Sequence, residues 1–170
     1  MTLQTSDLSA IPGYGSAMAW LRSGPKKMLI DGEWVASASG HTFRTTNPAT
    51  EEPLCEVASA GPEDVDRAVA AARRAYEAPG WAAITPHART NWLLKIADIV
   101  EKHADELAVI ETLDNGTPLS NSTRWVASGV QSLRYYAGWP SKIMGTTNPT
   151  EPGRFIYMLR EPVGVCALIN

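Results

Sequence analysis

The apolar run at the C-terminus constrains the fold of this chain more than any other feature. Residues 163–169 read Val-Gly-Val-Cys-Ala-Leu-Ile, and both alternating faces of this run are apolar. Strands with two apolar faces are typical of the centre of an α/β sheet, where other elements cover both sides. Without such cover, Val163, Val165, Leu168 and Ile169 would each forgo roughly 1.5–3 kcal/mol. We therefore expect a central strand here, and a longer parent protein that covers it.

The chain begins with β-type patterns. Asp31-Gly32 lies between two apolar runs and predicts a hairpin over residues 28–35, because both turn residues tolerate positive φ. Residues 42–46 and 54–58 predict two more strands, since the Asn-Pro pair between them interrupts a ladder. Residues 1–27 show little periodicity. We treat them as an N-terminal extension in which Met18, Trp20 and Leu21 could dock locally, and expect ordered structure to begin at Lys27.

The middle of the chain carries the start and stop signals of amphipathic helices. Proline at a first helical position, a capping Thr or a terminating Gly marks most of their ends. The expected helices run from Gly61-Pro62 to Pro79-Gly80, from Thr85-Pro86 through Val100, over residues 105–113, and from about Leu119 to Tyr136. A Gly/Thr/Asn/Pro-rich connection over residues 145–153 then leads to a further strand at residues 155–159.

The composition is that of a soluble globular protein. Of the 170 residues, 44% are hydrophobic and 19% are charged, which excludes disordered, collagenous and coiled-coil chains. A net charge of −3 provides no positive field for nucleic acid or an anionic membrane. The apolar runs fall well short of the roughly 20 residues that span a bilayer. With two cysteines and no secretory signal pattern, we expect a cytoplasmic protein with no nucleic-acid or membrane partner.

Common catalytic motifs are absent from the sequence. It contains no Walker loop, G-x-G-x-x-G, G-x-S-x-G or H-E-x-x-H pattern. Cys166 lies in the apolar run, where burial would make its thiol inert, and Cys55 lies in a strand pattern without an obvious base. Glu101, Glu106 and Glu111 have the helical spacing of a solvated face. These residues therefore predict no catalytic centre.

Two further patterns have both a structural and a functional interpretation. Tyr135, Tyr136 and Trp139 either pack a helix end or line a ligand site. Asp114 precedes an Asn-Gly pair that ends a helix, but a carboxylate beside turning carbonyls also suits a hard cation. From the residues alone, the structural interpretation is favoured for both patterns.

Six blocks of sequence carry a resemblance to a known family. They are Met28-Leu-Ile-Asp-Gly-Glu-Trp-Val35, Phe43-Arg-Thr-Thr-Asn-Pro-Ala-Thr50, Glu63-Asp-Val-Asp-Arg-Ala-Val-Ala-Ala-Ala-Arg73, Glu111-Thr-Leu-Asp-Asn-Gly-Thr-Pro118, Leu133-Arg-Tyr-Tyr-Ala-Gly-Trp139 and Arg160-Glu-Pro-Val-Gly-Val165. In this order they resemble the opening of the NAD(P)-dependent aldehyde dehydrogenase superfamily. The resemblance covers residues 28–170, and its aromatic block is most like that of the aromatic or broad-range aldehyde branches.

The resemblance implies an α/β fold of which this chain is the N-terminal part. A β-hairpin, short strands and amphipathic helices would precede the first strand of a Rossmann-like sheet. Residues 28–170 would form a partial cofactor-binding domain, which includes a strand of the oligomerisation arm near residues 154–161. The implied parent protein is a homo-oligomer with a chain roughly three times as long.

The resemblance also implies roles for individual residues. Ile169 and Asn170 match positions that line the dinucleotide groove, and Ser128 matches a position in the substrate tunnel. Asp114 and the backbone around Thr46 match a monovalent cation site of some relatives. The implied cofactor is NAD or NADP, and the implied substrate is a small-molecule aldehyde.

The implied chemistry uses a cysteine thiolate that adds to the aldehyde. The resulting thiohemiacetal would pass a hydride to the nicotinamide, and water would release the acid from the thioester so formed. The nucleophilic Cys and the general-base Glu of the family lie downstream of residue 170, and neither Cys55 nor Cys166 matches the nucleophile. We therefore expect that this chain alone is inactive and binds no cofactor tightly. The alternative is a truncated, non-catalytic module that associates with other protomers through an exposed strand and an apolar face.

Overall fold

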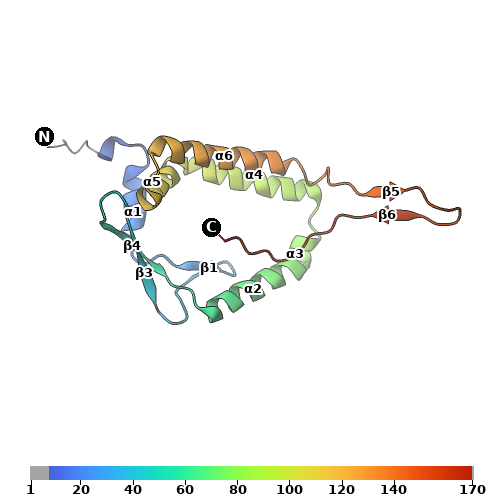
Figure 1. Cartoon of the computed structure of the whole chain (residues 1–170), viewed down its shortest axis with the longest axis horizontal. Coiled ribbons are helices and arrows are strands. Elements are labelled where there is room, and N and C mark those ends of the chain that lie inside the picture. Colours follow the sequence, from blue (N-terminus) through green and yellow to red (C-terminus); the bar gives the residue numbers. More distant parts are fainter. Residues whose placement is uncertain (1–7, 170) are drawn as a thin grey trace.

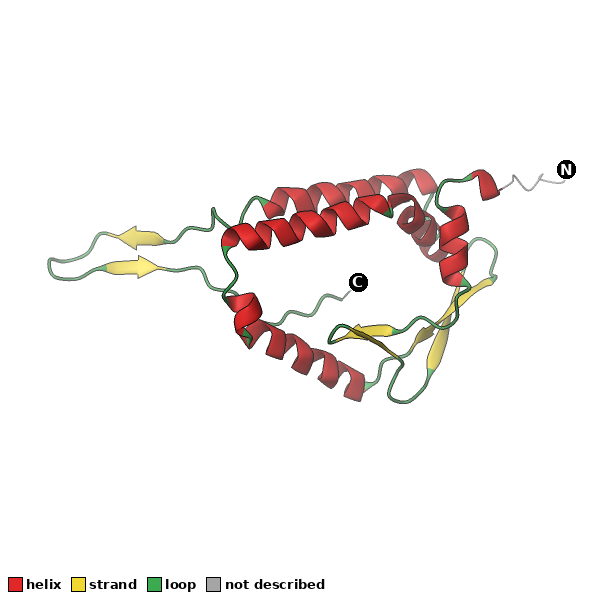
Figure 2. Ribbon diagram, turned by 180° about the vertical axis from the view of Figure 1, so that it is seen from behind, coloured by secondary structure: helices red, strands yellow, loops and turns green. Residues whose placement is uncertain are grey.

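The computed structural model describes residues 8–169, without the side chain of Ala82. Helices, hairpins and loops follow one another around an open ring, and the last described residues lie within its outline (Figures 1 and 2). The elements in chain order are η1 (Leu8–Ala10), α1 (Tyr14–Leu21), β1 (Met28–Ile30), β2 (Glu33–Val35), β3 (Thr42–Thr46), β4 (Pro53–Ala58), α2 (Pro62–Glu77), α3 (Pro79–Ala82), α4 (Pro86–Lys102), α5 (Ala104–Asn115), α6 (Leu119–Ala137), β5 (Thr146–Asn148) and β6 (Ile156–Met158).

The predicted hairpins are present. Strands β1 and β2 pair antiparallel around Asp31 and Gly32, whose φ angles are 56° and 81°, as the turn requires. Strands β3 and β4 also pair antiparallel, and their register shifts at Thr45/Thr46. An isolated bridge joins Lys26 to Val57 and connects the chain before β1 to the second hairpin.

Helices α4, α5 and α6 form the main packed body, in which α4 and α6 lie side by side (Figures 1 and 2). The Thr90 hydroxyl near the start of α4 donates to the Ala137 carbonyl at the end of α6, at 2.6 Å, so the two helices run antiparallel. Their contact is built from small residues, since Ala97 and Ala137 are almost fully buried. Small side chains allow the helix axes to approach closely.

Helix α1 packs against α5, which corrects the expectation that ordered structure begins at Lys27. Ala17 and Leu21 are buried on α1, and Ala108 and Val109 are buried on α5. A Cβ atom at Gly13, just before α1, would overlap the α5 backbone, so the two helices approach closely there. Local periodicity missed α1 because a short helix of mainly small and apolar residues has no polar face.

Helix α2 packs against the first hairpin. Ile30 of β1 and Ala71 of α2 are both buried, and the Arg74 guanidinium contacts the Asp31 carboxylate at 2.8 Å. The predicted apolar stripe of α2 is only partly covered, because Val65 and Val69 remain 52% and 49% exposed.

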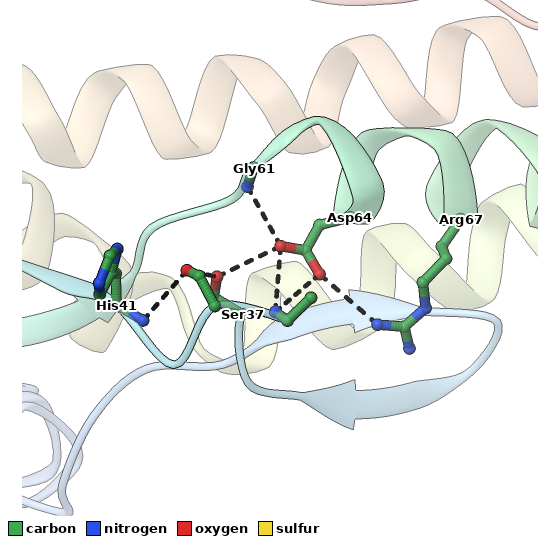
Figure 3. A network of polar contacts seen from close by, with 7 residues as sticks. Ser37, His41, Gly61, Asp64 and Arg67 are labelled. Carbon is green, nitrogen blue, oxygen red and sulfur yellow. Dashed lines mark hydrogen bonds and ion pairs between the residues drawn. The ribbon is translucent and has the colours of Figure 1, made fainter.

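A buried carboxylate connects the start of α2 to the loop before β3 (Figure 3). Asp64 is 1% exposed and accepts hydrogen bonds from the backbone N–H groups of Gly61 and Ala38, both at 3.1 Å, and from the Ser37 hydroxyl at 3.2 Å. The Arg67 guanidinium lies 3.5 Å from the same carboxylate. The Gly61 hydrogen bond is the largest cause of a lowered pKa for Asp64, and the bonds from Ala38 and Ser37 and the charge of Arg67 add to it against the opposing effect of burial. The ionised carboxylate therefore holds loop and helix together.

The C-terminal part differs from the sequence prediction in two ways. The strand expected at residues 155–159 is present as β6, but it pairs with β5, which lies within the segment predicted to be a connection. Residues 163–169 form no strand, which corrects the prediction of a central, doubly covered one. A strand forms only where a neighbouring backbone pairs with it, and none does so within the described chain. Val163 is 91% exposed and Leu168 88%, and the Cys166 thiol predicted to be buried is exposed.

Candidate functional site

The two thiols of the chain have no general base as a partner among the described contacts. The Cys55 thiol lies 3.6 Å from the Thr45 hydroxyl, and the Cys166 thiol lies 3.7 Å from the Gly164 carbonyl. A nucleophilic thiol requires a neighbouring base or cation that favours its thiolate. Neither position meets that requirement in residues 8–169.

The glutamates at helical spacing form ion pairs or line a groove. Glu101 pairs with Arg134 on α6, together with Asp98, and these contacts raise the pKa of the Arg134 guanidinium, the Glu101 hydrogen bond most strongly. The His103 Nδ1 lies 3.1 Å from the Glu106 carboxylate. Glu111 lies on the wall of the groove described next. This arrangement agrees with a mainly structural role for these carboxylates.

Ser128 lies on an exposed part of α6. An open apolar groove of about 600 Å³ lies between α4, α5 and α6, and Ser128 is not among the residues that line it. The groove is bounded by Val100, Leu107, Ile110, Glu111, Ser122, Trp125, Val126, Gly129 and Leu133. Ser128 is therefore not part of the wall of this groove, although its neighbour Gly129 is.

The two segments that carry Thr46 and Asp114 lie close together. A Cβ atom added to Gly116, at the end of α5, would lie 2.8 Å from the Pro48 side chain in the β3–β4 turn. Thr46 and Asp114 are both exposed on these neighbouring segments. Residues 8–169 contain no group of three or more His, Cys, Asp or Glu side chains suited to a metal ion. A cation at this position would depend on backbone oxygens and the Asp114 carboxylate.

The segment expected to face the cofactor lies beside α2. The Tyr76 hydroxyl donates to the Pro162 carbonyl at 3.5 Å, and a Cβ atom at Gly164 would lie 3.6 Å from the Arg73 guanidinium. Ile169 is 93% exposed, and Asn170 lies outside the described residues. No side chain in residues 162–169 is charged, and the described cation beside Gly164 is the Arg73 guanidinium.

Sequence reasoning missed two residues with unusual surroundings. Asp64 lies in the first turn of α2, and its burial depends on a loop distant in sequence. Arg89 lies in the first turn of α4 beside an aromatic cavity. Helix first turns favour acidic residues, so a basic residue there is a local signal that could have drawn attention.

In the described chain, no helix is long and apolar enough to cross a membrane.

Comparison with protein families decides the relationship of this chain. The pattern of the aldehyde dehydrogenase family matches residues 34–170. The chain belongs to the aldehyde dehydrogenase family. An aldehyde dehydrogenase from Aspergillus niger is 45% identical over 145 residues, covering 85% of this chain and 29% of that protein. The aldehyde dehydrogenase 1A1 of Ovis aries is 40% identical over 163 residues, covering 95% of this chain and 32% of that protein.

Solved structures show that the fold is that of an aldehyde dehydrogenase N-terminal segment. The NAD+ complex of an aldehyde dehydrogenase from Bacillus cereus matches with a TM-score of 0.79 and 43% identity, covering 84% of this chain and 29% of that chain. The chain spans about three-tenths of the length of the curated relatives it matches. It therefore has an α/β aldehyde dehydrogenase fold in part, as predicted, with small sheets and several helices.

Proposed function

We propose that these residues form the N-terminal scaffold of an enzyme that oxidises an aldehyde to a carboxylic acid with NAD or NADP, through a cysteine thiohemiacetal. The observation that carries this proposal is the continuous match of residues 34–170 to the family, together with the TM-score of 0.79 to a relative in complex with NAD+. The aromatic block at the end of α6 favours aromatic or broad-range aldehydes as substrates.

The proposed contribution of this chain is structural and not catalytic. Its thiols have a hydroxyl and a carbonyl as neighbours, and neither has a general base beside it among the described contacts. We therefore expect the 170-residue chain alone to show no dehydrogenase activity and no tight cofactor binding. No reaction step is assigned to its side chains.

A chimeric enzyme tests the scaffold role. Residues 1–170 would replace the matching N-terminal part of the Bacillus cereus enzyme, and NADH formation from benzaldehyde and NAD+ would be followed by absorbance. We expect turnover by the chimera and none by the 170-residue chain or by the remaining Bacillus cereus part alone. A folded chimera without activity, or turnover by the chain alone, would contradict the proposal.

The same chimera tests Ser128 as a wall of the substrate tunnel. Because Ser128 is exposed on α6, a Ser128→Phe substitution adds bulk without disturbing a packed core. We expect KM for benzaldehyde to rise while KM for acetaldehyde changes little. Ser120→Phe, also exposed on α6, is the matched control. Equal effects of the two substitutions would argue against a tunnel position. We also propose that Ile169 and Asn170 contact the cofactor in the parent enzyme, and that Thr46 and Asp114 belong to a monovalent cation site.

Association with other protomers has two competing surfaces. The hairpin β5–β6 projects from the ring (Figure 1), and Phe155 and Tyr157 on it are 76% and 59% exposed, which supports a homo-oligomer built through this arm. Residues 163–169 have no strand partner in the described chain and are mostly exposed, which supports the alternative, a non-catalytic module that adds a strand to another protomer.

Sedimentation of charged variants separates these two surfaces. If the arm joins protomers, Tyr157→Asp lowers the sedimentation coefficient and Leu168→Asp leaves it unchanged. The opposite pattern would favour the module that pairs through residues 163–169.

We further propose a cytoplasmic location for the parent protein, on the grounds of its composition and its two unpaired cysteines.

A further inference from the structure

A small cavity between the start of α4 and the end of α6 contains a single charged side chain among its described lining residues. The cavity has a volume of about 320 Å³. Small-molecule sites in proteins span roughly 300–1,000 Å³, so it has room for a small ligand. Arg89 supplies the charge, and the other lining residues are Ile84, Pro86, Leu93, Tyr136, Trp139, Pro140 and Ile143.

The Arg89 guanidinium has few acceptors for its hydrogen bonds within the described chain. Its Nη2 donates one long bond of 3.4 Å to the Trp81 carbonyl, and its Cζ lies 5.0 Å from the centre of the Trp81 ring. Its Nε is buried and has no hydrogen-bond partner in residues 8–169. A guanidinium has five N–H donors and stays charged at any physiological pH. Arg89 can therefore bind an anion that the described chain does not supply.

The position of Arg89 also favours an anion. Pro86 is the first residue of α4, so Arg89 lies near the positive N-terminal end of the helix dipole, where the Thr85 hydroxyl already caps the Ala88 N–H. A carboxylate near this end gains from both charges. The aromatic rings of Tyr136 and Trp139 provide apolar surface for the remainder of a ligand. Tyr136 and Trp139 therefore fit the ligand-lining role that the sequence left open, and the ligand is one with a carboxylate for Arg89.

We propose that this cavity binds a small organic acid with an apolar body. Its carboxylate accepts two hydrogen bonds from the Arg89 guanidinium, one of them from the unpartnered Nε, because the planar guanidinium matches the two carboxylate oxygens. Its apolar part packs against Leu93, Tyr136 and Trp139. A glutamate or aspartate side chain of a protein segment carries the same anionic group, and the test below distinguishes the two sources.

Isothermal titration of the 170-residue chain with benzoate tests the proposal. We expect saturable binding of benzoate, and binding at least about tenfold weaker for benzamide, which has the same shape and no charge. Arg89→Gln should weaken benzoate binding by at least about tenfold, and Arg89→Lys should weaken it less, since lysine keeps the charge but loses the fork. Arg154→Gln, an exposed arginine in the β5–β6 connection, is the control and should bind like the wild type.

Several results would overturn the proposal. These are no saturable benzoate binding, equal binding of benzoate and benzamide, or unchanged binding in Arg89→Gln with a native far-UV circular dichroism spectrum. If Arg89→Gln does not fold, the Arg89→Lys variant decides. The proposal is overturned if folded Arg89→Lys binds benzoate as tightly as the wild type and binds benzamide just as tightly. Tighter binding of N-acetylglutamate methylamide than of benzoate would assign the site to a protein side chain and overturn the small-acid assignment.

Discussion

At the scale of single residues, Asp64 shows how a helix start becomes a tertiary contact. Its side chain accepts from Gly61 within its own helix start and from Ser37 and Ala38 in a loop more than twenty residues earlier. The short-range bond is an ordinary capping interaction, which a first-turn acid predicts. The long-range bonds arise only because the first hairpin folds back onto α2.

The stability that Asp64 contributes should depend on pH in a defined direction. Its pKa in the folded chain lies below the ordinary value of 3.8, chiefly because of the Gly61 hydrogen bond. A lowered folded pKa gives stability that is present above pH 3.8 and is lost as the pH falls through the lower folded value. We expect Asp64→Asn to have a lower Tm than the wild type at neutral pH.

The difference between the two Tm values should shrink as the pH falls below 3.8. Thermal unfolding followed by circular dichroism across this range measures it. Glu56 also has a lowered pKa, mainly through a hydrogen bond from the Thr42 hydroxyl. Because Glu56 is present in both proteins, its contribution cancels in the difference between their Tm values. A difference that stays constant down to the lowest pH would show that Asp64 acts through its shape and not its charge.

Two glycines predict opposite effects of the same substitution. Gly116 has φ 80° and would place a Cβ atom 2.8 Å from the Pro48 side chain, so Gly116→Ala should destabilise the chain by about 1–2 kcal/mol or more. Gly129, within α6, has no atom near its added Cβ, so Gly129→Ala should stabilise by roughly 0.5–1 kcal/mol. Urea unfolding of both variants measures these changes. The same sign for both would refute the argument from backbone conformation.

At the scale of elements, the ends of α2, α4, α5 and α6 were predicted to within a few residues because their signals are local, whereas α1 and α3 were not predicted and Pro79, expected as a stop, begins α3. The Thr85 side chain accepts from the Ala88 N–H at 3.1 Å, as its position before Pro86 predicts, and α5 ends at Gly116 in the left-handed conformation. The β5–β6 hairpin was predicted only in part. Thr146–Asn148 has no apolar alternation, and its pairing with Ile156–Met158 decides its conformation.

The capping role of Thr85 gives an element-scale prediction. Thr85→Ala removes the acceptor for an otherwise unpaired N–H at the start of α4 and should cost about 1 kcal/mol of unfolding free energy. The matched control is Thr123→Ala on α6, where the hydroxyl donates to the Leu119 carbonyl of its own helix on an exposed face. We expect that control to change stability by less than about 0.5 kcal/mol. Equal losses in urea unfolding would argue against the cap.

At the scale of the whole molecule, a packed helical body is joined to hairpins and helices that remain partly uncovered. Buried side chains gather on α1, α4, α5 and α6, while large apolar side chains on α2 and on residues 163–169 remain exposed. This distribution agrees with a chain that has about three-tenths of the length of its relatives.

Hydrogen exchange should reveal the same division. Amides of residues 163–169 have no strand partner in the described chain, so they should exchange at nearly the rate of an unstructured peptide. Amides in the middle of α6, around the buried Val130, should be protected. Mass spectrometry of peptic fragments measures both. Strong protection of residues 163–169 would show that they pair with another chain, which the sedimentation variants would then identify.

The sequence by itself determined the ends of α2, α4, α5 and α6 to within a few residues, and strands β1 to β4, through caps, prolines and the Asp31-Gly32 turn. Its six ordered blocks indicated the family. These features depend on residues that are neighbours in the sequence and on the order of short sequence blocks along the chain. Only the tertiary structure decided that α1 packs on α5, that Asp64 is buried by a distant loop, that Arg89 lies in an aromatic cavity, and that residues 163–169 form no strand. Each of these depends on which backbone or side chain comes alongside, because burial and strand pairing are properties of two segments and not of one.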